Sequence, residues 1–564
     1  MKHITKEMLL EAIKNTQSTK TAADYLNISR RTTLRLKNKY GIPVGADHLI
    51  RNSLDIVKNK DVKENKEEKP KFVEPINDKL VNKFKGKFKE KSDSRYLETK
   101  KFVITSVQND KMIDLPFFNT LKAYCIKQNA QLLLVPNYYK MTEFSSFLIP
   151  ENEQMYFDNV SLTENLKLLS RLRVLPTIVD PFAGLDGVSK GDSIIIAHPQ
   201  VALKTMATLG ESPAQMYTTG SLTVADDAYQ DTKTGYKAEF NHSIAALLIE
   251  TGIGDSFFAR HLNADENGGF YDCCTGGEGY YIGNEFYKLS HIEALYTGDE
   301  HAIVADPLVI NATYTNDDSI ANILKPKVLC RGDVLDFQSQ NHHDLNDSLM
   351  QYGKFQLGLS SISDELNHMC KHINNTTPEF SRNLLIDSNH NDAFYKWLTT
   401  INIKGDFVNA KLYHKMTYLM MEELEQSPSG VKYPNLIELW IKNSEWVYNE
   451  TLTDKLEFVG RRGSYKICDV EVSMHGDKGI NGAKGSPIGF SRLPTKSIVG
   501  HSHSPSIKQG CYTVGTSSLM DLSYNAGPSS WMQSHCIIYP EITPLGNKNG
   551  KRQMLSIING KWRA

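Results

Sequence analysis

The 564-residue sequence contains no run of about 18 apolar residues, the length that a membrane-spanning helix requires. Its first ten residues, MKHITKEMLL, are charged and lack the apolar stretch of a secretory signal. The eight cysteines include no CxxC pair, and a chain of this length does not need disulfides to be stable. We therefore expect a soluble, cytoplasmic protein with free thiols and no membrane partner.

Sequence patterns that cradle phosphate groups are also missing. The Gly-rich stretches FAGLDGVSKGD and CCTGGEGYYIGNE have neither the GxxxxGK(S/T) spacing of a P-loop nor the strand-GxGxxG-helix setting of a dinucleotide site. No internal repeat of about 20 to 50 residues is visible. We expect both Gly-rich stretches to be loops, and the adjacent Cys273 and Cys274 to belong to one of them.

Charge is distributed unevenly along a chain whose formal net charge is only −1. Residues 1–100 hold 24 Lys and Arg against 14 Asp and Glu, whereas the remaining 464 residues hold 40 against 51. A basic arm on an acidic body suggests that the arm meets a polyanion and that the body carries metal-binding carboxylates. The alternative is a lysine-rich segment that is merely solvated.

Two short helices joined by a tight turn are expected near the N-terminus, after a first helix over residues 4–16. The stretches TAADY, LNI and SRRTTLRLKNKY follow one another and resemble a Fis-like helix-turn-helix within a domain of residues 1–48. The alternative is a small helical protein-docking module. On the first interpretation, the residues that contact DNA are Arg30, Arg31, Thr32, Arg35 and Lys37.

Composition changes twice along the rest of the chain. Residues 49–99 mix Lys, Glu, Asp and Asn with few large apolar residues, which predicts a charged, flexible linker. From residue 100, the succession of FVITSV, DLPFFNTLKAYCIKQN and QLLLVP predicts strand, helix and strand. We expect residues 100–290 to form an α/β accessory region, which serves oligomerisation or packs on a catalytic domain of residues 291–564.

Short apolar strands that end in metal-binding residue types recur in the C-terminal half. IEALYTGDEH ends in Asp299 and His301, which would point to the same side of an extended chain and reach one ion. KVLCRGDVLD closes on Gly332 and Asp333, where the glycine permits a tight turn and the carboxylate can bridge two cations. Each pattern alone is weak, because a solvated turn has the same sequence.

Three further strand ends follow in order. LLIDSNHND contributes Asn389, a neutral oxygen ligand, and His390, which is placed to donate a proton or stabilise developing charge. VEVSMHG ends in His475, and SIVGHSH carries His501 and His503 at the two-residue spacing of the first motif. A single histidine is more often structural than a ligand, but five such motifs in succession favour a metal site.

The order D-x-H, G-D-x-x-D, N-H, H-G and G-H-x-H over about residues 292–520 resembles the calcineurin-like metallophosphoesterase superfamily, which includes the SbcD-type nucleases. The resemblance implies an α/β fold of two packed β-sheets flanked by helices. One departure is Asn391, which stands where the family has an acid; Asp387 or Asp392 could replace it. The resemblance also implies the site residues: one metal on Asp299, His301 and His503, a second on Asn389, His475 and His501, Asp333 bridging, and His390 as the catalytic histidine.

Two cations a few ångströms apart lower the pKa of a bridging water and neutralise phosphate oxygens during in-line displacement. The mixed ligand set suits two Mn²⁺ ions, with Zn²⁺ or Fe²⁺ as alternatives. His342 and His343 follow the second motif and are candidate substrate contacts. The layout FVITSVQND, then QLLLVPNYYK, then the metal motifs is similar to the pre-early DNA-degradation proteins of T5-like bacteriophages.

That resemblance implies a nuclease that attacks host DNA in the host cytoplasm. We therefore expect a hydrolase that is a Mn²⁺-dependent DNA nuclease, directed to DNA by its basic arm and acting as a homo-oligomer. One alternative is a phosphoesterase that acts on a phosphoprotein or a small phosphodiester. Another is a DNA-binding regulatory protein whose metal site is vestigial.

Overall fold

The structure is a computed structural model that describes Met8 and residues 100–564, except for 139–143, 145–152, 210–212, 226–227, 253–255, 342–346, 427–433, 444–453, 523–524, 526 and 547–549. Met8 aside, the expected helix-turn-helix and linker lie outside the described residues, and so do the candidate substrate contacts. The residues concerned are Arg30, Arg31, Thr32, Arg35, Lys37, His342 and His343.

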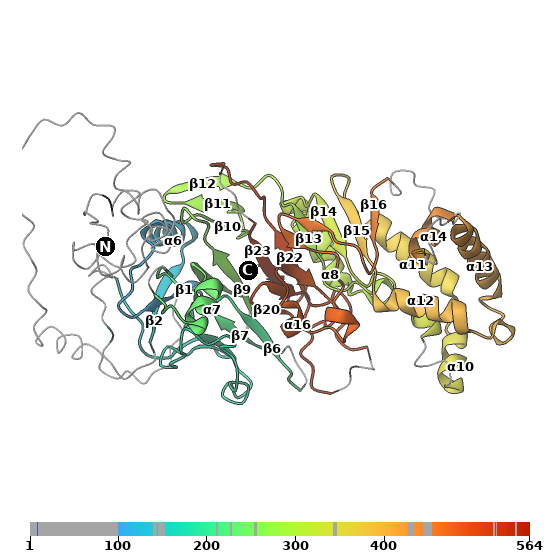
Figure 1. Ribbon diagram of the computed structural model, residues 1–564, viewed down its shortest axis with the longest axis horizontal. Helices are drawn as coiled ribbons and strands as arrows, with labels where there is room; N and C mark the ends of the chain where they lie inside the picture. Colours follow the sequence, from blue (N-terminus) through green and yellow to red (C-terminus); the bar gives the residue numbers. More distant parts are fainter. Residues whose placement is uncertain are drawn as a thin grey trace, which may run out of the picture.

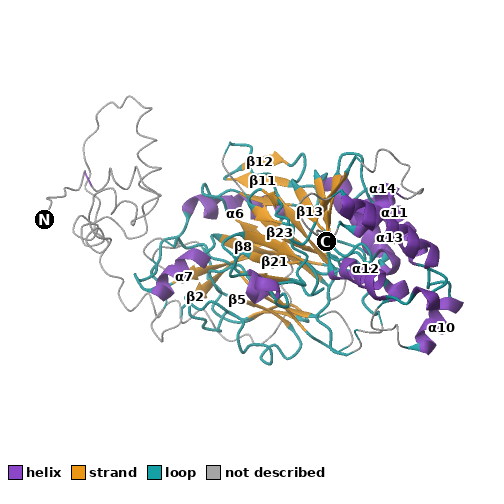
Figure 2. Cartoon of the chain, turned by 45° about the vertical axis from the view of Figure 1, so that its right-hand side comes forward, coloured by secondary structure: helices purple, strands orange, loops and turns teal. Residues whose placement is uncertain are grey.

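Strands form the centre of the molecule, and the helices of residues 348–443 lie together at one end of it (Figures 1 and 2). One layer contains two sheets. The first has the order β2-β1-β8-β9, with β1 Lys101–Gln108, β2 Gln131–Asn137, β8 Ala245–Thr251 and β9 Phe257–Asn263. The second has the order β16-β15-β14-β13-β22-β23, with β13 Ala294–Tyr296, β14 Val328–Arg331, β15 Arg382–Ile386, β16 Leu456–Val459, β22 Ser534–Ile538 and β23 Arg552–Ser556.

The second layer is a ten-stranded sheet that draws strands from both halves of the sequence, in the order β17-β18-β19-β21-β20-β6-β7-β5-β4-β3. The earlier half supplies β3 Val160–Thr163, β4 Leu166–Leu168, β5 Ser193–Ile196, β6 Leu203–Met206 and β7 Ala214–Thr218. The later half supplies β17 Lys466–Ile467, β18 Val470–Glu471, β19 Lys496–Val499, β20 Ser506–Lys508 and β21 Cys511–Thr513.

Alternation of apolar side chains along the strands explains why the two layers pack. On β1, Phe102 and Ile104 face one core, whereas Val103 and Val107 face another. The first of these cores also takes inward-facing residues from the six-stranded sheet and the ten-stranded sheet, among them the fully buried Tyr296. Side chains of successive strand residues point to opposite faces, so each sheet buries one face against the other layer and one against helices or loops.

The ten-stranded sheet joins the accessory region to the expected catalytic region. Strand β6 pairs antiparallel with β20, with Leu203 opposite Ile507. The side chain of Gln553 in β23 also donates to the carbonyl of His261 in β9 over 3.0 Å. Residues 100–290 therefore contribute to the same core as residues 291–564, although the domain boundaries themselves stay a prediction.

The expected strand, helix and strand at the start of the body are confirmed as β1, α6 and β2. Helix α6, Leu115–Gln128, begins after Asp114, whose side chain accepts from the backbone N–H of Phe117 over 3.0 Å. It ends at Gln128, and the next residue, Asn129, caps it in the left-handed conformation. No helix in the described ranges is long and apolar enough to span a bilayer.

One local prediction is wrong. The stretch CCTGGEGYYIGNE contains strand β11, Gly279–Ile282, between β10 Phe270–Asp272 and β12 Glu285–Lys288. A Cβ at Gly279 would lie 2.3 Å from the carbonyl oxygen of Tyr287, so the glycine lets these strands approach.

The remaining helices frame the sheets. Those between β15 and β16, together with α11, pack on the outer face of the six-stranded sheet at one end of the molecule (Figure 1). The bounds of the helices that follow α6 are α7 Lys233–Asn241, α8 Pro307–Ile310, α9 Ile320–Leu324, α10 Ser348–Gln356, α11 Ile362–Asn375, α12 Asn389–Thr400, α13 Ala410–Glu425, α14 Leu436–Asn443 and α16 Pro487–Phe490. Short turns of 3-10 or π helix cover Ala302–Val304, Asn311–Thr315, Gln338–Gln340, Ile403–Gly405 and Ile480–Gly482.

Candidate metal centre

The candidate metal ligands come from the carboxyl ends of parallel strands in both layers. Strands β13, β14 and β15 run parallel to one another, and Asp299, Asp333 and Asn389 follow their ends. In the ten-stranded sheet, β18 and β19 are parallel and precede His475 and His501. Because parallel strands end at one edge of a sheet, the loops that carry these residues converge where the two layers meet.

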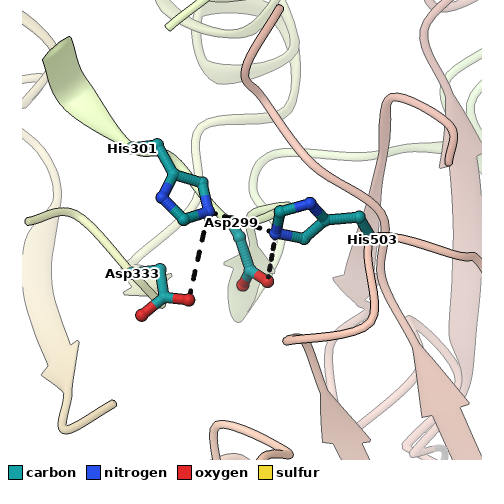
Figure 3. A group of neighbouring side chains, drawn as sticks. All are labelled: Asp299, His301, Asp333 and His503. Atoms are coloured by element: carbon teal, nitrogen blue, oxygen red, sulfur yellow. Dashed lines mark hydrogen bonds and ion pairs between the residues drawn. The ribbon is translucent and has the colours of Figure 1, made fainter. Parts of the chain in front are cut away.

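Four buried side chains form the first group: Asp299, His301, Asp333 and His503 (Figure 3). Their ligand atoms lie within 4.8 Å of one another. Nε2 of His301 is 3.1 Å from Nε2 of His503, and the latter is 3.2 Å from Oδ2 of Asp299. Oδ2 of Asp333 completes the group at 4.0 Å from Nε2 of His301. These atoms converge on one small volume, as ligands of a single ion do.

A second group adjoins the first and shares Asp333 with it. His475 and His501 are its other members. Nε2 of His475 lies 2.9 Å from Oδ2 of Asp333 and 3.1 Å from Oδ1 of Asn389. The ring of His501 crosses that of His475 at a centroid distance of 5.3 Å. Asp333 thus stands between two sets of nitrogen and oxygen donors.

The chemistry of the donor atoms fits divalent metal ions. Oδ1 of Asp299 and Oδ1 of Asp333 are buried and accept no hydrogen bond within the described part of the chain. A buried carboxylate oxygen that accepts no hydrogen bond is costly, and a bound cation offsets that cost. The facing nitrogens of His301 and His503 also need a proton or an ion between them. Carboxylate, imidazole and amide donors together suit borderline cations.

Electrostatics within the cluster favours ionised carboxylates. Burial acts to raise the pKa of Asp333, but the charges of His475 and His390 outweigh it and hold that pKa well below its ordinary value. Burial acts to lower the pKa of His301, yet the hydrogen bond that its Nδ1 donates to Asp336 and the nearby carboxylates raise it to about 9. A cation that binds here therefore replaces protons on imidazole nitrogens.

Backbone geometry places the ligands differently from the sequence-based expectation. We expected Asp299 and His301 to lie on one side of an extended chain, but β13 already ends at Tyr296. His301 is left-handed and its N–H donates to the carbonyl of Asp333 over 2.7 Å, so a turn rather than a strand aims both side chains. Four ligand residues have positive φ: His301 at 41°, Asp333 at 44°, His501 at 70° and His503 at 53°. Such conformations are strained for residues with a Cβ and cluster at functional sites.

His390 lies at the start of α12, beside both groups. Its side chain is 21% exposed, and its Nε2 is 3.8 Å from Oδ2 of Asp333. Nδ1 donates to the backbone carbonyl of Asp336, which assigns the proton of a neutral ring to Nδ1 and leaves Nε2 facing the cluster. His390 is therefore the candidate residue with both a path to solvent and a nitrogen directed at the shared carboxylate.

Asp336 is a site residue to which sequence reasoning gave no role. Its Oδ1 lies 2.8 Å from Nδ1 of His301 and 3.8 Å from Nδ1 of His390. A carboxylate on the second nitrogen of a metal-binding imidazole fixes the ring and raises its basicity. The signal was present in the sequence, because Asp336 is the second acid of the G-D-x-x-D motif.

Asn391, which stands where the calcineurin-like family has an acid, and the acids near it connect the turn that carries His390 to neighbouring segments. Asn391 donates to Oδ1 of Asp387 over 2.8 Å, and Oδ2 of Asp392 pairs with Nη2 of Arg461 over 3.0 Å. Arg461 also pairs with Asp477, two residues after His475. Asp387 and Asp392 therefore link the His390 turn to the His475 loop through Arg461.

Glu300, between two candidate ligands, was also missed. It is fully buried and its carboxylate lies 3.2 Å from Nη1 of Arg331 and 2.7 Å from Nε2 of His372. The hydroxyls of Tyr314 and Thr297 donate to its Oε1 over 2.7 and 3.0 Å. Burial alone would raise the pKa of Glu300, but Arg331 and His372 lower it to about 2. The ion pair ties the turn after β13 to β14 and to α11.

Comparison with known proteins gives one informative match. No protein-family model matches the sequence. The chain is 31% identical over 490 residues to Protein A1 of Escherichia phage T5, and the alignment covers 82% of this chain and 83% of that protein. Residues 1–99 hold less than a fifth of the chain, so an alignment over 82% of the chain must extend over most of residues 100–564. It therefore includes strands of both layers.

Proposed function

This chain belongs to the family of Protein A1 of Escherichia phage T5, and we propose that it is a metal-dependent nuclease that hydrolyses phosphodiester bonds in DNA. The observation that carries the proposal is the pair of donor groups that share the buried Asp333. Two adjacent cation sites joined by one carboxylate are the arrangement that enzymes use on phosphate esters. The two packed layers and the order of the motifs support a calcineurin-like fold.

The residues that would hold the two ions are those that the motifs predicted. Bound Mn²⁺ ions supply a nucleophile from water at neutral pH and neutralise charge on the phosphate. Mn²⁺ accepts imidazole, carboxylate and amide ligands together. The first ion would bind Asp299, His301 and His503. The second ion would bind Asn389, His475 and His501, and Asp333 would bind both ions.

The chain's own residues would orient the substrate and move protons. His390 keeps its Nδ1 proton on the carbonyl of Asp336, so a protonated ring presents its second N–H at Nε2, toward Asp333 and solvent. From there it can donate a hydrogen bond to a phosphate oxygen or a proton to the leaving oxygen. Asp336 holds His301 in the orientation that directs Nε2 toward His503.

DNA is the proposed substrate because of the charge at the N-terminus. Residues 1–100 carry 24 basic against 14 acidic residues, and the expected helix-turn-helix lies within them. Positive charge in such an arm attracts the phosphate backbone independently of base sequence. Degradation of host DNA in the host cytoplasm by a homo-oligomer is the biological role that we propose.

Incubation of circular and linear DNA with the protein and Mn²⁺ tests the proposal. We expect cleavage that EDTA abolishes, that His390→Ala reduces by at least about 100-fold, and that His414→Ala leaves unchanged. His414 is exposed on α13, so it controls for the loss of an imidazole. Equal cleavage by the wild type and His390→Ala would overturn the catalytic assignment.

A second substrate separates the nuclease from the other functions considered. If bis(4-nitrophenyl) phosphate is hydrolysed but DNA is not, the protein is a phosphoesterase of small or protein substrates. If Mn²⁺ binds in a titration and neither substrate is hydrolysed, the regulatory reading with a vestigial site is favoured.

A further inference from the structure

Trp531 is half-buried and lies directly beside the metal centre. The other tryptophans of the described ranges, Trp397, Trp440 and Trp562, are buried, whereas Trp531 is only half-buried. Its ring lies 4.2 Å from the ring of His503, centroid to centroid, with the planes at 69°. Tryptophan combines a large apolar face with one N–H, so a tryptophan that is not fully buried beside a site is suited to contact a ligand.

The segment that carries Trp531 is held on both sides. Ser529 and Thr208 exchange two backbone hydrogen bonds, over 2.9 and 3.0 Å, which attach the segment to the end of β6. The N–H of Met532 donates to the carbonyl of His503 over 3.0 Å. The hydroxyls of Ser530 and Ser504 lie 2.7 Å apart. The backbone on both sides of Trp531 is therefore held in place relative to His503, so the segment loses little conformational freedom when a ligand binds.

We propose that Trp531 forms a stacking subsite for a nucleobase adjacent to the phosphodiester at the metal centre. The proposal rests on the nuclease function and narrows its substrate class. A base can stack on an indole only when one of its faces is released from the neighbouring base. The subsite therefore selects single-stranded DNA, frayed ends or locally opened duplex over continuous duplex. Because every base has a π face, the preference is independent of sequence.

An alternative role for Trp531 is to pack His503 in place. In that case, the substitution weakens metal binding and affects all substrates equally. A substrate without bases separates the two roles. Such a substrate cannot stack on Trp531 even in the wild type, so a substitution that removes only stacking leaves its binding unchanged.

Binding of a short oligonucleotide in EDTA provides the test, because it needs neither metal nor turnover. The probes are a fluorescein-labelled tetranucleotide and a strand of equal length built from abasic residues. Trp531→Leu retains apolar volume without an aromatic face, and Trp531→Phe restores a face. Phe240→Ala is the control, because Phe240 is an aromatic residue of α7 that is 85% exposed.

We expect Trp531→Leu to weaken binding of the tetranucleotide by about 5- to 100-fold, the range for one stacked base. Binding of the abasic strand should be unchanged, Trp531→Phe should recover most of the affinity, and Phe240→Ala should have no effect. Equal affinities of the wild type and Trp531→Leu for the tetranucleotide would overturn the proposal. An equal loss on both strands would do the same and would assign Trp531 to packing.

Hydrolysis of DNA and of bis(4-nitrophenyl) phosphate with Mn²⁺ distinguishes failure of the subsite from failure of the nuclease function. If the wild type cleaves DNA but Trp531→Leu binds both strands normally, only the stacking subsite is wrong. If the wild type cleaves neither substrate yet binds the base-bearing strand through Trp531, the nuclease function is wrong and the base-binding site stands.

Discussion

The carboxylate of Asp299 lies against the bare backbone of Gly500, where a Cβ would come within 2.3 Å of its Oδ1. The neighbouring N–H of His501 donates to Oδ2 of the same carboxylate over 2.6 Å. The glycine of the GHSH motif therefore lets a loop from one sheet close over an acid delivered by the other. No larger residue fits there without displacing a candidate metal ligand.

Gly500→Ala should consequently impair the metal centre more than the fold. The added methyl group displaces the Asp299 carboxylate, and a misplacement of about 1 Å at such a site can cost about 100-fold in rate. Mn²⁺ affinity from titration calorimetry and DNA cleavage should both fall. The control is Gly405→Ala, because a Cβ at Gly405 meets nothing within 4 Å. Unaltered Mn²⁺ affinity in Gly500→Ala would contradict this account of the motif.

Asp333→Asn should weaken the binding of both ions, because Asp333 belongs to both donor groups. Loss of an outer contact to a metal ligand already costs about 10- to 100-fold in affinity, so loss of a shared ligand should cost more. His501→Ala should weaken only the second ion. Titration calorimetry with Mn²⁺ measures stoichiometry and affinity in each variant. If Asp333→Asn and His501→Ala lose the same single ion, Asp333 is not a bridge.

Glu300→Ala should destabilise the protein by about 3–5 kcal/mol, since it leaves the buried guanidinium of Arg331 without its carboxylate partner. Replacing both residues, as in Glu300→Leu with Arg331→Met, should cost less than the single change. Urea unfolding followed by circular dichroism gives the free energies. A double variant less stable than Glu300→Ala would show that the pair itself contributes net stability.

Acid should destabilise the fold through buried histidines far from the metal centre. Burial lowers the pKa of His261 to about 4, although its hydrogen bond with the carbonyl of Thr218 opposes that shift. The unfolded chain, with a histidine pKa of about 6.5, binds the extra proton between these values. The stabilisation is thus complete above about pH 6.5 and is lost as pH falls to about 4, by roughly 3 kcal/mol.

The measurement is the free energy of unfolding between pH 4 and 7 in EDTA. His261→Gln removes one titrating group and should flatten the pH dependence, whereas His414→Gln, at an exposed position, should not. Identical slopes in the wild type and His261→Gln would show that His261 does not titrate in this range. Two further histidines with a pKa near 4, His198 and His242, should add to the slope, and so should His535, which accepts from the N–H of Gly298 beside Asp299.

Removal of residues 1–99 should separate DNA affinity from chemistry. The shortened chain should bind long DNA more weakly and with a shallower dependence on salt concentration, because fewer phosphate contacts release fewer counterions. Its hydrolysis of bis(4-nitrophenyl) phosphate should match that of the full chain. Filter binding over a range of salt concentrations measures the slope. An unchanged slope would assign the DNA contacts to the body instead of the arm.

Sequence patterns predicted the parts of the site that are local in the chain. The apolar runs that stop abruptly before Asp299, Asp333 and Asn389 correspond to β13, β14 and β15, because a buried strand must end where polar ligands begin. The conformation of those ends was not predictable from the pattern. His301 and Asp333 are left-handed because their turns hydrogen-bond to each other across the two strands.

Contacts between distant segments account for the residues that the sequence did not reveal. Arg331 and His372 lie 31 and 72 residues after Glu300 in the sequence, and only the fold brings them into contact with its carboxylate. Trp531 is likewise ordinary in sequence and gains its significance from its place beside His503. Ligand residues at the end of a strand can be predicted from the local sequence, whereas the partners that another helix or strand supplies to them cannot.

The shared ten-stranded sheet also dictates when the metal centre can exist. Thr205, in β6, bonds to the carbonyl of Pro505, 300 residues later. At about 5–20 residues per second, a ribosome needs roughly 15–60 s to cover that interval. During this time β6 has no β20 to pair with, and His475, His501 and His503 have not all been made. A nascent chain therefore holds no complete set of candidate ligands until His503 has been added, and a metal centre with both donor groups cannot form before then.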